Sequence, residues 1–312
     1  NRGDLTAGSM VRAYLAGPRN DDERRSLAVG TDSAGGYTVP TPLAREFIDL
    51  LRTLTRVIQA GAQTVSMPSQ TLTMAKLLTD VVPTYRGELG AVSEDQPTLG
   101  EVALSANSLA DVIRVSRELL HDSGNIDSSI DTTIANAFSI EVDRAALFGS
   151  GTSNEPTGLV NTAGVQTTDM AVNGAALAGY GEVLSHHQAL SDANVNLDGV
   201  ASLMAPRTQF ALAALTATDN QPLMAPEPWA SVRKLPTTAV PVNQDQGTAN
   251  DASSIITGDF RDLYIGMRQE LQVQRLNERY ADTLEVGFLA SMRYDIAITR
   301  PASFSILRGI TP

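Results

Sequence analysis

The sequence predicts an α+β fold, and three observations support this prediction. Residues 125–148 repeat apolar side chains at every third or fourth position, which indicates one long helix. Residues 63–112 alternate apolar and polar side chains on both sides of a centre punctuated by Gly and Pro, which indicates a long two-stranded hairpin. Residues 255–298 again show the pattern of strands, so helices and strands are both major components.

Length, charge and residue usage limit the function. At about 150 residues per domain, 312 residues predict two domains or one elaborate one. The net charge of −12 argues against a dedicated nucleic-acid binder, although it leaves room for a protein that merely surrounds nucleic acid. The absence of cysteine excludes disulfides, thiolate metal sites and thiol nucleophiles, and three histidines are too few for a His-rich metal site.

The amino-terminal part divides into an arm and a helix. Residues 1–40 combine glycines, prolines and a run of charges, so we expect them to lie on another surface or to be disordered alone. Residues 41–62 predict a helix that Thr41 caps and Gly61 closes. Its apolar stripe consists of Leu43, Phe47, Leu50, Leu51, Leu54, Val57 and Ile58. The chain begins with Asn1 instead of methionine, so we expect a processed or truncated terminus, and no apolar run suggests a membrane span.

The hairpin at 63–112 has a physical consequence. An isolated hairpin of this length cannot bury both of its faces and is marginal in water. It therefore needs a partner surface, and a neighbouring subunit is the natural supplier. A short helical turn at 116–120 follows, and then the long helix, which at 1.5 Å per residue is roughly 36 Å long.

The rest of the chain has a mixed pattern. Residues 149–174 form a crossing rich in Gly, Ser, Asn and Thr. A helix is expected at 179–192 and a strand at 200–204. Pro206 opens a further helix, because proline suits a first helical turn, and a proline-rich loop at 220–241 precedes the closing strands.

A search for an active site finds none. The Gly-rich stretch 149–158 lacks the phosphate-loop pattern and follows a helix, so we interpret it as a structural crossing. His186 and His187 are adjacent and would point about 100° apart on a helix, so they cannot chelate one ion as an i, i+4 pair does. We expect both to be surface or partly buried residues, and His121 has no evident partner.

Two further patterns have structural explanations. Asp127 and Asp131 lie in the first turns of the long helix, where acids interact favourably with the helix dipole. No G-x-S-x-G elbow occurs among the serines. We therefore predict no catalytic, cofactor-binding or metal-binding residues and no enzyme activity, and a soluble α+β hydrolase remains only as a remote alternative.

Several short motifs follow one another between residues 27 and 310. They are Gly35–Pro40 (GGYTVP), Tyr85-x-x-Glu88, Ser116–Ser123 (SRELLHDS), Asp143–Gly151 (DRAALFGSG) with Pro156 and Gly158, Tyr264–Arg268, Arg293–Asp295 and Arg300–Phe304. In number, order and spacing they resemble the major capsid protein of tailed bacteriophages, the Hong Kong-97-type capsid fold. Each motif alone is weak, and their combination carries the resemblance.

The resemblance implies a division of the chain and a history. It assigns an N-terminal arm (1–40), a helix of the body (41–62), an extended loop formed by the long hairpin (63–112), a peripheral domain (113–174 and 261–312) with a spine helix at about 125–148, and an axial domain (175–260). Family members are usually made with an N-terminal scaffolding segment that a phage protease removes, and a start at Asn1 suits that history.

The function implied by the resemblance is structural. The chain would assemble with itself into pentamers and hexamers of an icosahedral phage head. That head would enclose double-stranded DNA without sequence-specific binding and without a membrane. Portal, scaffold or protease, and decoration proteins would be further partners, and the protein would belong to the virion and, during assembly, to the host cytoplasm. Alternatives with the same fold are an encapsulin-type nanocompartment shell and a gene-transfer-agent capsid.

Charge suggests where subunits meet. The distal part of the hairpin is net acidic, with Arg86 against Glu88, Glu94, Asp95 and Glu101. We expect it to lie on a neighbour's peripheral domain near the basic residues Arg114, Arg117 or Arg144. In some relatives a lysine of the extended loop forms an isopeptide bond with a neighbour. Here the only lysines are Lys76 and Lys234, so a shell held by non-covalent contacts is expected.

Overall fold

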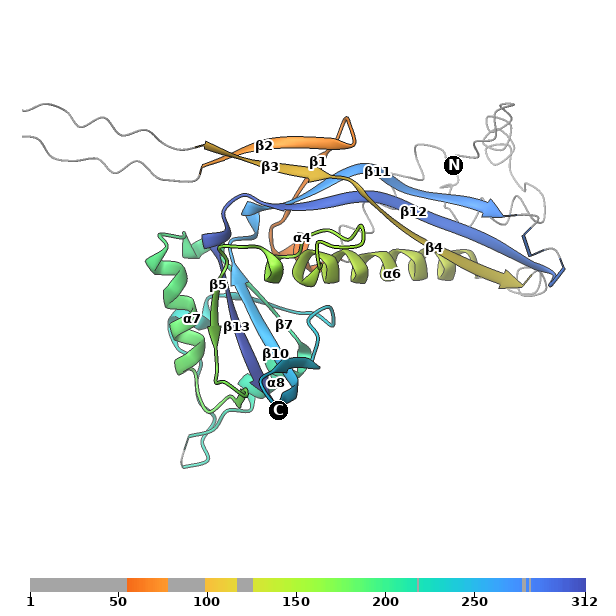
Figure 1. Cartoon of the computed structure of the whole chain (residues 1–312). Helices are drawn as coiled ribbons and strands as arrows, with labels where there is room; N and C mark the ends of the chain where they lie inside the picture. Colours follow the sequence, from red (N-terminus) through yellow and green to blue (C-terminus); the bar gives the residue numbers. More distant parts are fainter. Residues whose placement is uncertain (1–54, 78–98, 117–125, 218, 277–278, 281) are drawn as a thin grey trace, which may run out of the picture.

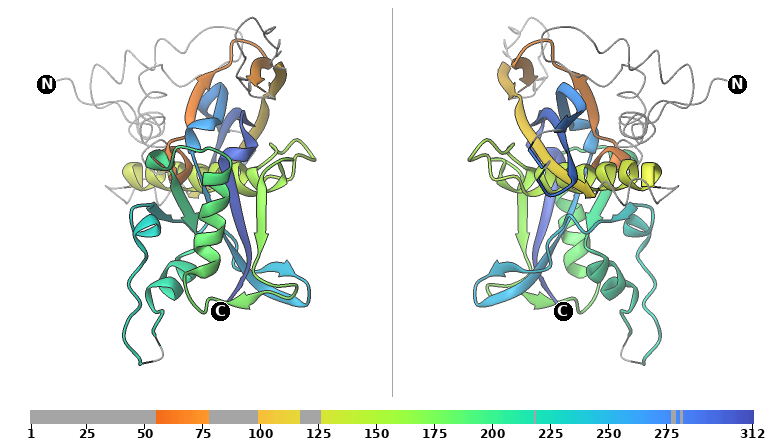
Figure 2. Two further views of the ribbon diagram at one scale, coloured as in Figure 1. Left: turned by 90° about the vertical axis from the view of Figure 1, so that its left-hand side faces the viewer. Right: turned by 90° about the vertical axis from the view of Figure 1, so that its right-hand side faces the viewer.

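The computed structural model describes residues 55–77, 99–116, 126–217, 219–276, 279–280 and 282–312. Within them the fold consists of two β-sheets, a separate two-stranded ribbon and several helices (Figure 1). The longest helix lies between the two sheets, which Figure 2 shows from both ends. The predicted arm at 1–40 and the distal part of the hairpin lie outside the described residues.

The first sheet and the longest helix pack together. The helix, α6 (Ile126–Phe148), confirms the predicted spine helix. The sheet has the order β1 (Gln63–Ser66), β11 (Leu263–Leu276), β12 (Glu285–Ile298), β4 (Asn107–Ser116), with β1 parallel to β11 and the other pairs antiparallel. Ile134, Phe138 and Val142 of α6 are 1–3% exposed and share one apolar cluster with Phe288 and Met292 of β12. The side chain of Ile130 lies outside the described residues.

The second sheet is surrounded by shorter elements. Its main path is β5 (Gln166–Asp169), β13 (Phe304–Thr311), β10 (Ala249–Gly258), β7 (Ala201–Met204), β8 (Arg233–Pro236), with β6 (Ala175–Ala176) beside β13 and β9 (Gln244–Gln246) beside β10. The helices of this part are α7 (Gly181–Asp192), α8 (Pro206–Ala213) and α9 (Glu227–Ala230). The positions of α7, β7 and α8 confirm the predictions for 179–192, 200–204 and Pro206.

The second sheet has an apolar cluster on each of its faces, and one of these clusters also contains α6 and the first sheet. Ile256, Leu203 and Ile306 are neighbours in register and belong to the cluster around α6. The adjacent residues Ile255 and Leu307 belong to a second cluster, which α7 covers. Because successive strand residues point to opposite faces, the two sheets share one core through a single face of the second sheet.

The strand pairings cross the limits of the predicted segments. Residues 63–66 and 107–116 pair within the first sheet, so the paired ribbon is shorter than 63–112 and consists of β2 (Thr71–Leu77) and β3 (Leu99–Ser105). The strands β5 and β13 lie in the second sheet, although 113–174 and 261–312 were expected to form one domain with the spine helix. An alternating pattern reveals the faces of a strand but not its partner strand, which is why the sequence misplaces these segments.

The predicted helix at 41–62 does not run without a break. Helix α4 begins at Arg56 and ends at Ala60, and Thr55 before it has an extended backbone. The N–H groups of Arg56 and Val57 donate to the carboxylate of Asp143 in α6, each at 2.9 Å. Gly61 closes α4 with a φ of 127°, as predicted. Residues 41–54 lie outside the described part of the chain.

The core position of α6 can be tested with an acidic substitution. Ile134→Asp would place an unpaired carboxylate in the apolar cluster, and we expect it to cost several kcal/mol and to abolish soluble expression. Ile140→Asp is the matched control, because Ile140 lies on the same helix and is 52% exposed. Soluble yield and denaturant unfolding measure both variants. Equal behaviour of the two variants would contradict the assignment of the buried face.

The clamp between Asp143 and α4 predicts a pH dependence. Asp143 is 3% exposed, and burial raises its pKa from 3.8 to about 6, against the opposing effect of the two N–H groups. The folded state therefore keeps a proton that the unfolded chain has lost, so stability from this group is full below 3.8 and is lost as pH rises through 6. We expect the unfolding free energy, relative to Asp143→Asn, to fall between about pH 4 and 7. The exposed Asp192→Asn is the control, and a pH-independent difference would contradict the prediction.

Candidate assembly site at the base of the ribbon

The ribbon of β2 and β3 leaves the body through a small apolar plug. Met67, Leu104, Ala106 and Ala297 are each at most 5% exposed and form a cluster of their own. Gly266 of β11 lies under this plug, and a Cβ atom there would be 2.8 Å from the sulfur of Met67. A larger residue at this position would push the plug away from the sheet, which explains the glycine in the motif Tyr264–Arg268.

Hydrogen bonds fix the corner between β3 and β4. The carboxylate of Asp295 accepts from the backbone N–H of Ser105 at 2.5 Å, and the guanidinium of Arg293 donates to the carbonyl of Ala106 at 3.4 Å. Both side chains come from β12, two residues apart and therefore on one face. Burial raises the pKa of Asp295, and its backbone hydrogen bonds oppose the rise. The motif Arg293–Asp295 thus holds the ribbon at its base.

The apolar face of the ribbon loses its cover with distance from the body. Leu72 lies opposite Leu104, and Met74 lies opposite Val102, so these four side chains share one face. Leu104 is fully buried, whereas Leu72, Met74 and Val102 are only partly buried. Figure 1 shows the ribbon over one end of the first sheet, from which it extends outward. Within the described residues the ribbon therefore presents an incompletely covered apolar face.

The Gly-rich crossing after α6 is a tight structural junction. The N–H of Gly158 donates to the carbonyl of Gly149 at 2.9 Å, and the amide of Asn161 donates to the same carbonyl at 2.7 Å. A Cβ on Gly149 would be 2.2 Å from the carbonyl oxygen of Pro156, and one on Gly158 would be 2.3 Å from the nitrogen of Gly149. Close backbone approach therefore requires these glycines.

Of the predicted contact residues, only Arg114 and Arg144 lie in the described part. Arg114 on β4 has a 59% exposed side chain, lies 3.7 Å from the carboxylate of Glu285 and stands over the ring of Tyr280. Arg144 donates to the carboxylate of Glu141 at 2.6 and 3.0 Å and also bonds Glu155. Arg144 is thus held by two acids of its own chain, while Arg114 remains more available. Outside the described residues are Arg86, Glu88, Glu94, Asp95 and Arg117.

The two adjacent histidines are more buried than predicted. His186 and His187 are 0% and 4% exposed, because α7 packs on β13. The Nδ1 atom of His186 lies 2.7 Å from the hydroxyl of Ser305. Burial lowers the pKa of His186 to about 3, so the ring is neutral near pH 7. The two histidines are therefore buried residues of the packing between α7 and the second sheet.

Metal-binding clusters and membrane-spanning helices were the remaining possibilities for this part of the chain. In the part of the chain that the structure describes, no cluster of three or more His, Asp or Glu residues could hold a metal ion. No helix among these residues is long and apolar enough to cross a membrane. The amine of Lys234 donates to the carbonyls of Trp229, Val232 and Ala230 at 2.7, 3.2 and 3.3 Å and lies over the Trp229 ring, so it closes α9.

Comparison with known proteins agrees with this architecture. The capsid chain of a native GTA particle, computed with C5 symmetry, superposes with a TM-score of 0.63 at 21% identity, over 94% of this chain and 100% of that chain. A chain from Mycobacterium phage Bobi gives a TM-score of 0.64 at 18% identity, over 81% and 89% of the two chains. The fold is thus an α+β fold of the Hong Kong-97 capsid type.

Sequence similarity identifies the family. The model of the phage capsid family matches residues 35–309, and the chain belongs to this family. The major capsid protein of Klebsiella oxytoca phage phiKO2 is 25% identical over 283 residues, 87% of this chain and 65% of the relative. That of Halomonas phage phiHAP-1 is 22% identical over 175 residues, 55% of this chain and 28% of the relative. The chain therefore spans less than two thirds of the length of these curated relatives.

The hydrogen bond from the backbone N–H of Ser105 to Asp295 can be tested by hydrogen exchange. In Asp295→Ala the N–H of Ser105 loses its acceptor, and we expect a cost of about 1–3 kcal/mol and faster exchange of amides in β3. Ser291→Ala, four residues away and therefore on the same face of β12, is the control and should leave the exchange unchanged. Unaltered protection of Ser105 in Asp295→Ala would show that this contact does not fix the ribbon.

Proposed function

We propose that this chain is the structural subunit of an icosahedral shell and not an enzyme. The observation that carries the proposal is the ribbon, because it is anchored at its base and, among the residues that the structure describes, its apolar face is only partly covered. In an assembly of identical chains, a neighbouring subunit can provide the surface that covers this apolar face. Membership of the phage capsid family supports the same conclusion.

The two parts of the body suit two kinds of contact. The four-stranded sheet with α6 would be the peripheral domain, which receives a neighbour's ribbon. The second sheet with α7 and α8 would be the axial domain, which gathers around five- and six-fold axes. In this second part Phe210 and Met224 are 72% and 91% exposed, and apolar contacts between copies would cover them. Copies related by such axes form closed pentamers and hexamers.

The contents of the shell would be double-stranded DNA. A chain with a net charge of −12 provides no strong electrostatic grip on phosphates, which suits DNA that must enter and leave. The portal, a scaffold or protease and decoration proteins would be further partners. The protein would be found in the virion and, while shells assemble, in the host cytoplasm.

A gene-transfer-agent capsid is the second candidate. The similarity to capsid chains of native and empty GTA particles, over 94% and 92% of this chain, favours it. Purified particles treated with nuclease and then sequenced separate the candidates. A single protected phage genome supports the phage head, and protected fragments of a host genome support the gene-transfer particle. Particles with a protein cargo and no protected DNA would contradict both and support an encapsulin-type compartment.

The distal hairpin provides the mutational test of assembly. Deletion of residues 86–98 should leave a subunit that folds but assembles poorly, because the ribbon would lose its contact with the neighbour. Circular dichroism and particle yield measure the two effects. The charge variant Glu88→Gln, Glu94→Gln, Asp95→Asn is the control, and it should still assemble, since exposed pairs contribute about 0–1 kcal/mol each. Normal shells from the deletion variant would refute the role of the hairpin.

The absence of covalent linkage between subunits is a separate prediction. The segment 86–98 contains no lysine, and the amine of Lys234 is bound by three carbonyl groups of its own chain. We expect purified particles, boiled in detergent, to give one band near 33.1 kDa on a denaturing gel. A ladder of covalent pentamers and hexamers would contradict this prediction and indicate that Lys76 or Lys234 is reactive.

A further inference from the structure

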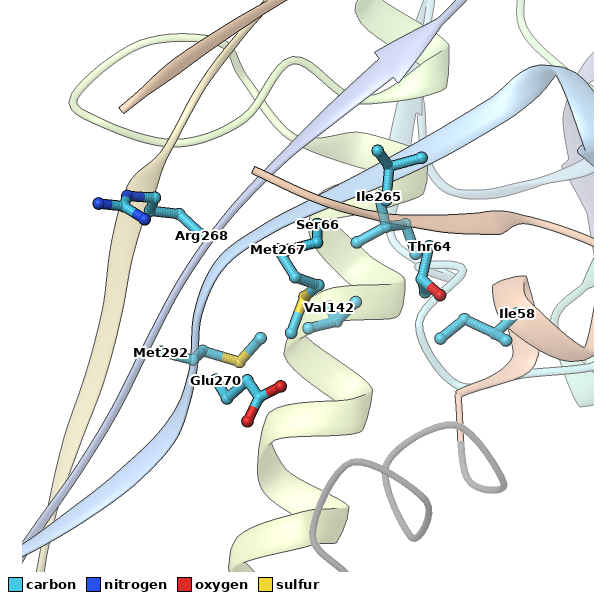
Figure 3. A pocket seen from close by; sticks show the side chains of 10 residues that line it. Ile58, Thr64, Ser66, Val142, Ile265, Met267, Arg268, Glu270 and Met292 are labelled. Atoms are coloured by element: carbon cyan, nitrogen blue, oxygen red, sulfur yellow. The ribbon is translucent and has the colours of Figure 1, made fainter. Parts of the chain in front are cut away.

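A pocket of about 370 Å³ opens between α6 and the first sheet. Its walls include Ile58 of α4, Val142 of α6, Ile265 and Met267 of β11, and Met292 of β12. Figure 3 shows Met267, Met292 and Val142 close together, while the guanidinium of Arg268 points away from them. Thr64, Ser66, Arg268 and Glu270 also line the pocket, so it combines apolar side chains with polar ones that reach solvent. Because protein interiors are closely packed, a hollow of this size beside the apolar core is a place where another segment can pack.

The chain itself leads to this pocket. Val142, in the wall, is followed by Asp143, which holds the first N–H groups of α4. One turn into α4, Ile58 forms another part of the wall. Thr55, directly before α4, is 0% exposed. Thr55 is only three residues from Ile58, so the segment that precedes it is joined to the body within about 11 Å of a wall of the pocket.

The preceding segment is too apolar to remain in water. Of the twelve residues 43–54, seven are apolar, namely Leu43, Ala44, Phe47, Ile48, Leu50, Leu51 and Leu54. Burying one such large side chain contributes roughly 1.5–3 kcal/mol. The segment therefore needs an apolar surface, and the pocket is an open one next to its point of attachment.

We propose that this pocket is the docking site for residues 43–54 of the same chain. Docking there would cover the partly exposed side chains of Ile58 and Met267 and would fix the point at which residues 1–40 leave the body. The proposal goes beyond shell assembly, because the site lies within one subunit and can be occupied before any neighbour is present.

The test uses the natural lack of cysteine, since any disulfide must come from introduced residues. In the full-length, unassembled chain, Leu51→Cys is combined with Glu270→Cys, which lines the pocket and is exposed. The matched control combines Leu51→Cys with Gln274→Cys, an exposed residue opposite Leu289 on the face of the sheet turned away from α6. After mild oxidation, non-reducing gels and thiol titration report the products.

We expect an intramolecular disulfide in the Glu270 pair and free thiols in the Gln274 pair. Disulfide-linked dimers would overturn the proposal, because the segment would then occupy the pocket of another copy. Free thiols in both pairs would overturn it as well. A second measurement needs no cysteine: trypsin should cut after Arg52 at least tenfold more slowly in the natural chain than in Leu51→Asp. Equal cutting rates would show that the segment is not docked.

Discussion

The structure depends on one constraint, which is that a two-stranded ribbon cannot bury both of its faces. In the described part of the chain, the ribbon is fully buried at its base alone. At the base, Met67 and Leu104 form a dry plug, and Asp295 binds the backbone where β3 turns into β4. Farther out, Met74 and Val102 are only partly covered. A ribbon that is fixed at its base and incompletely buried beyond it is suited to contact another subunit.

The body that carries the ribbon is held together by one continuous apolar core and a polar contact at its amino-terminal side. Helix α6 lies between the two sheets, and one face of the second sheet joins the cluster around α6. The clamp from Asp143 to α4 adds a polar joint at the point where the amino-terminal segment enters. Burying a carboxylate has a cost, which the two N–H groups offset only in part, as the raised pKa of Asp143 indicates. The joint therefore contributes direction more than stability.

Local sequence patterns predicted most helices and strands, whereas features that depend on contacts between distant residues could not be predicted. The periodicity of apolar residues located α6 and α7, and Gly61 marked the end of α4. The extended backbone at Thr55 was not predictable, because the acceptor for the first N–H of α4 is Asp143, 87 residues from Arg56. The sequence of β13 indicated an apolar strand but not the sheet to which it belongs. The 3₁₀ turn at Pro301–Ser303 directly precedes β13, which pairs with β10 in the second sheet. The contact of Asp295 with the ribbon had one usable signal in the sequence, an acid directly before the apolar run Ile296–Ile298.

The central claim is that the ribbon and the body together make a subunit that assembles with itself. The size of the purified natural assembly, measured by light scattering and negative-stain electron microscopy, tests this claim most directly. The account predicts closed particles of uniform size that contain a large number of copies. A protein that remains a monomer of 33.1 kDa at every salt concentration would contradict it.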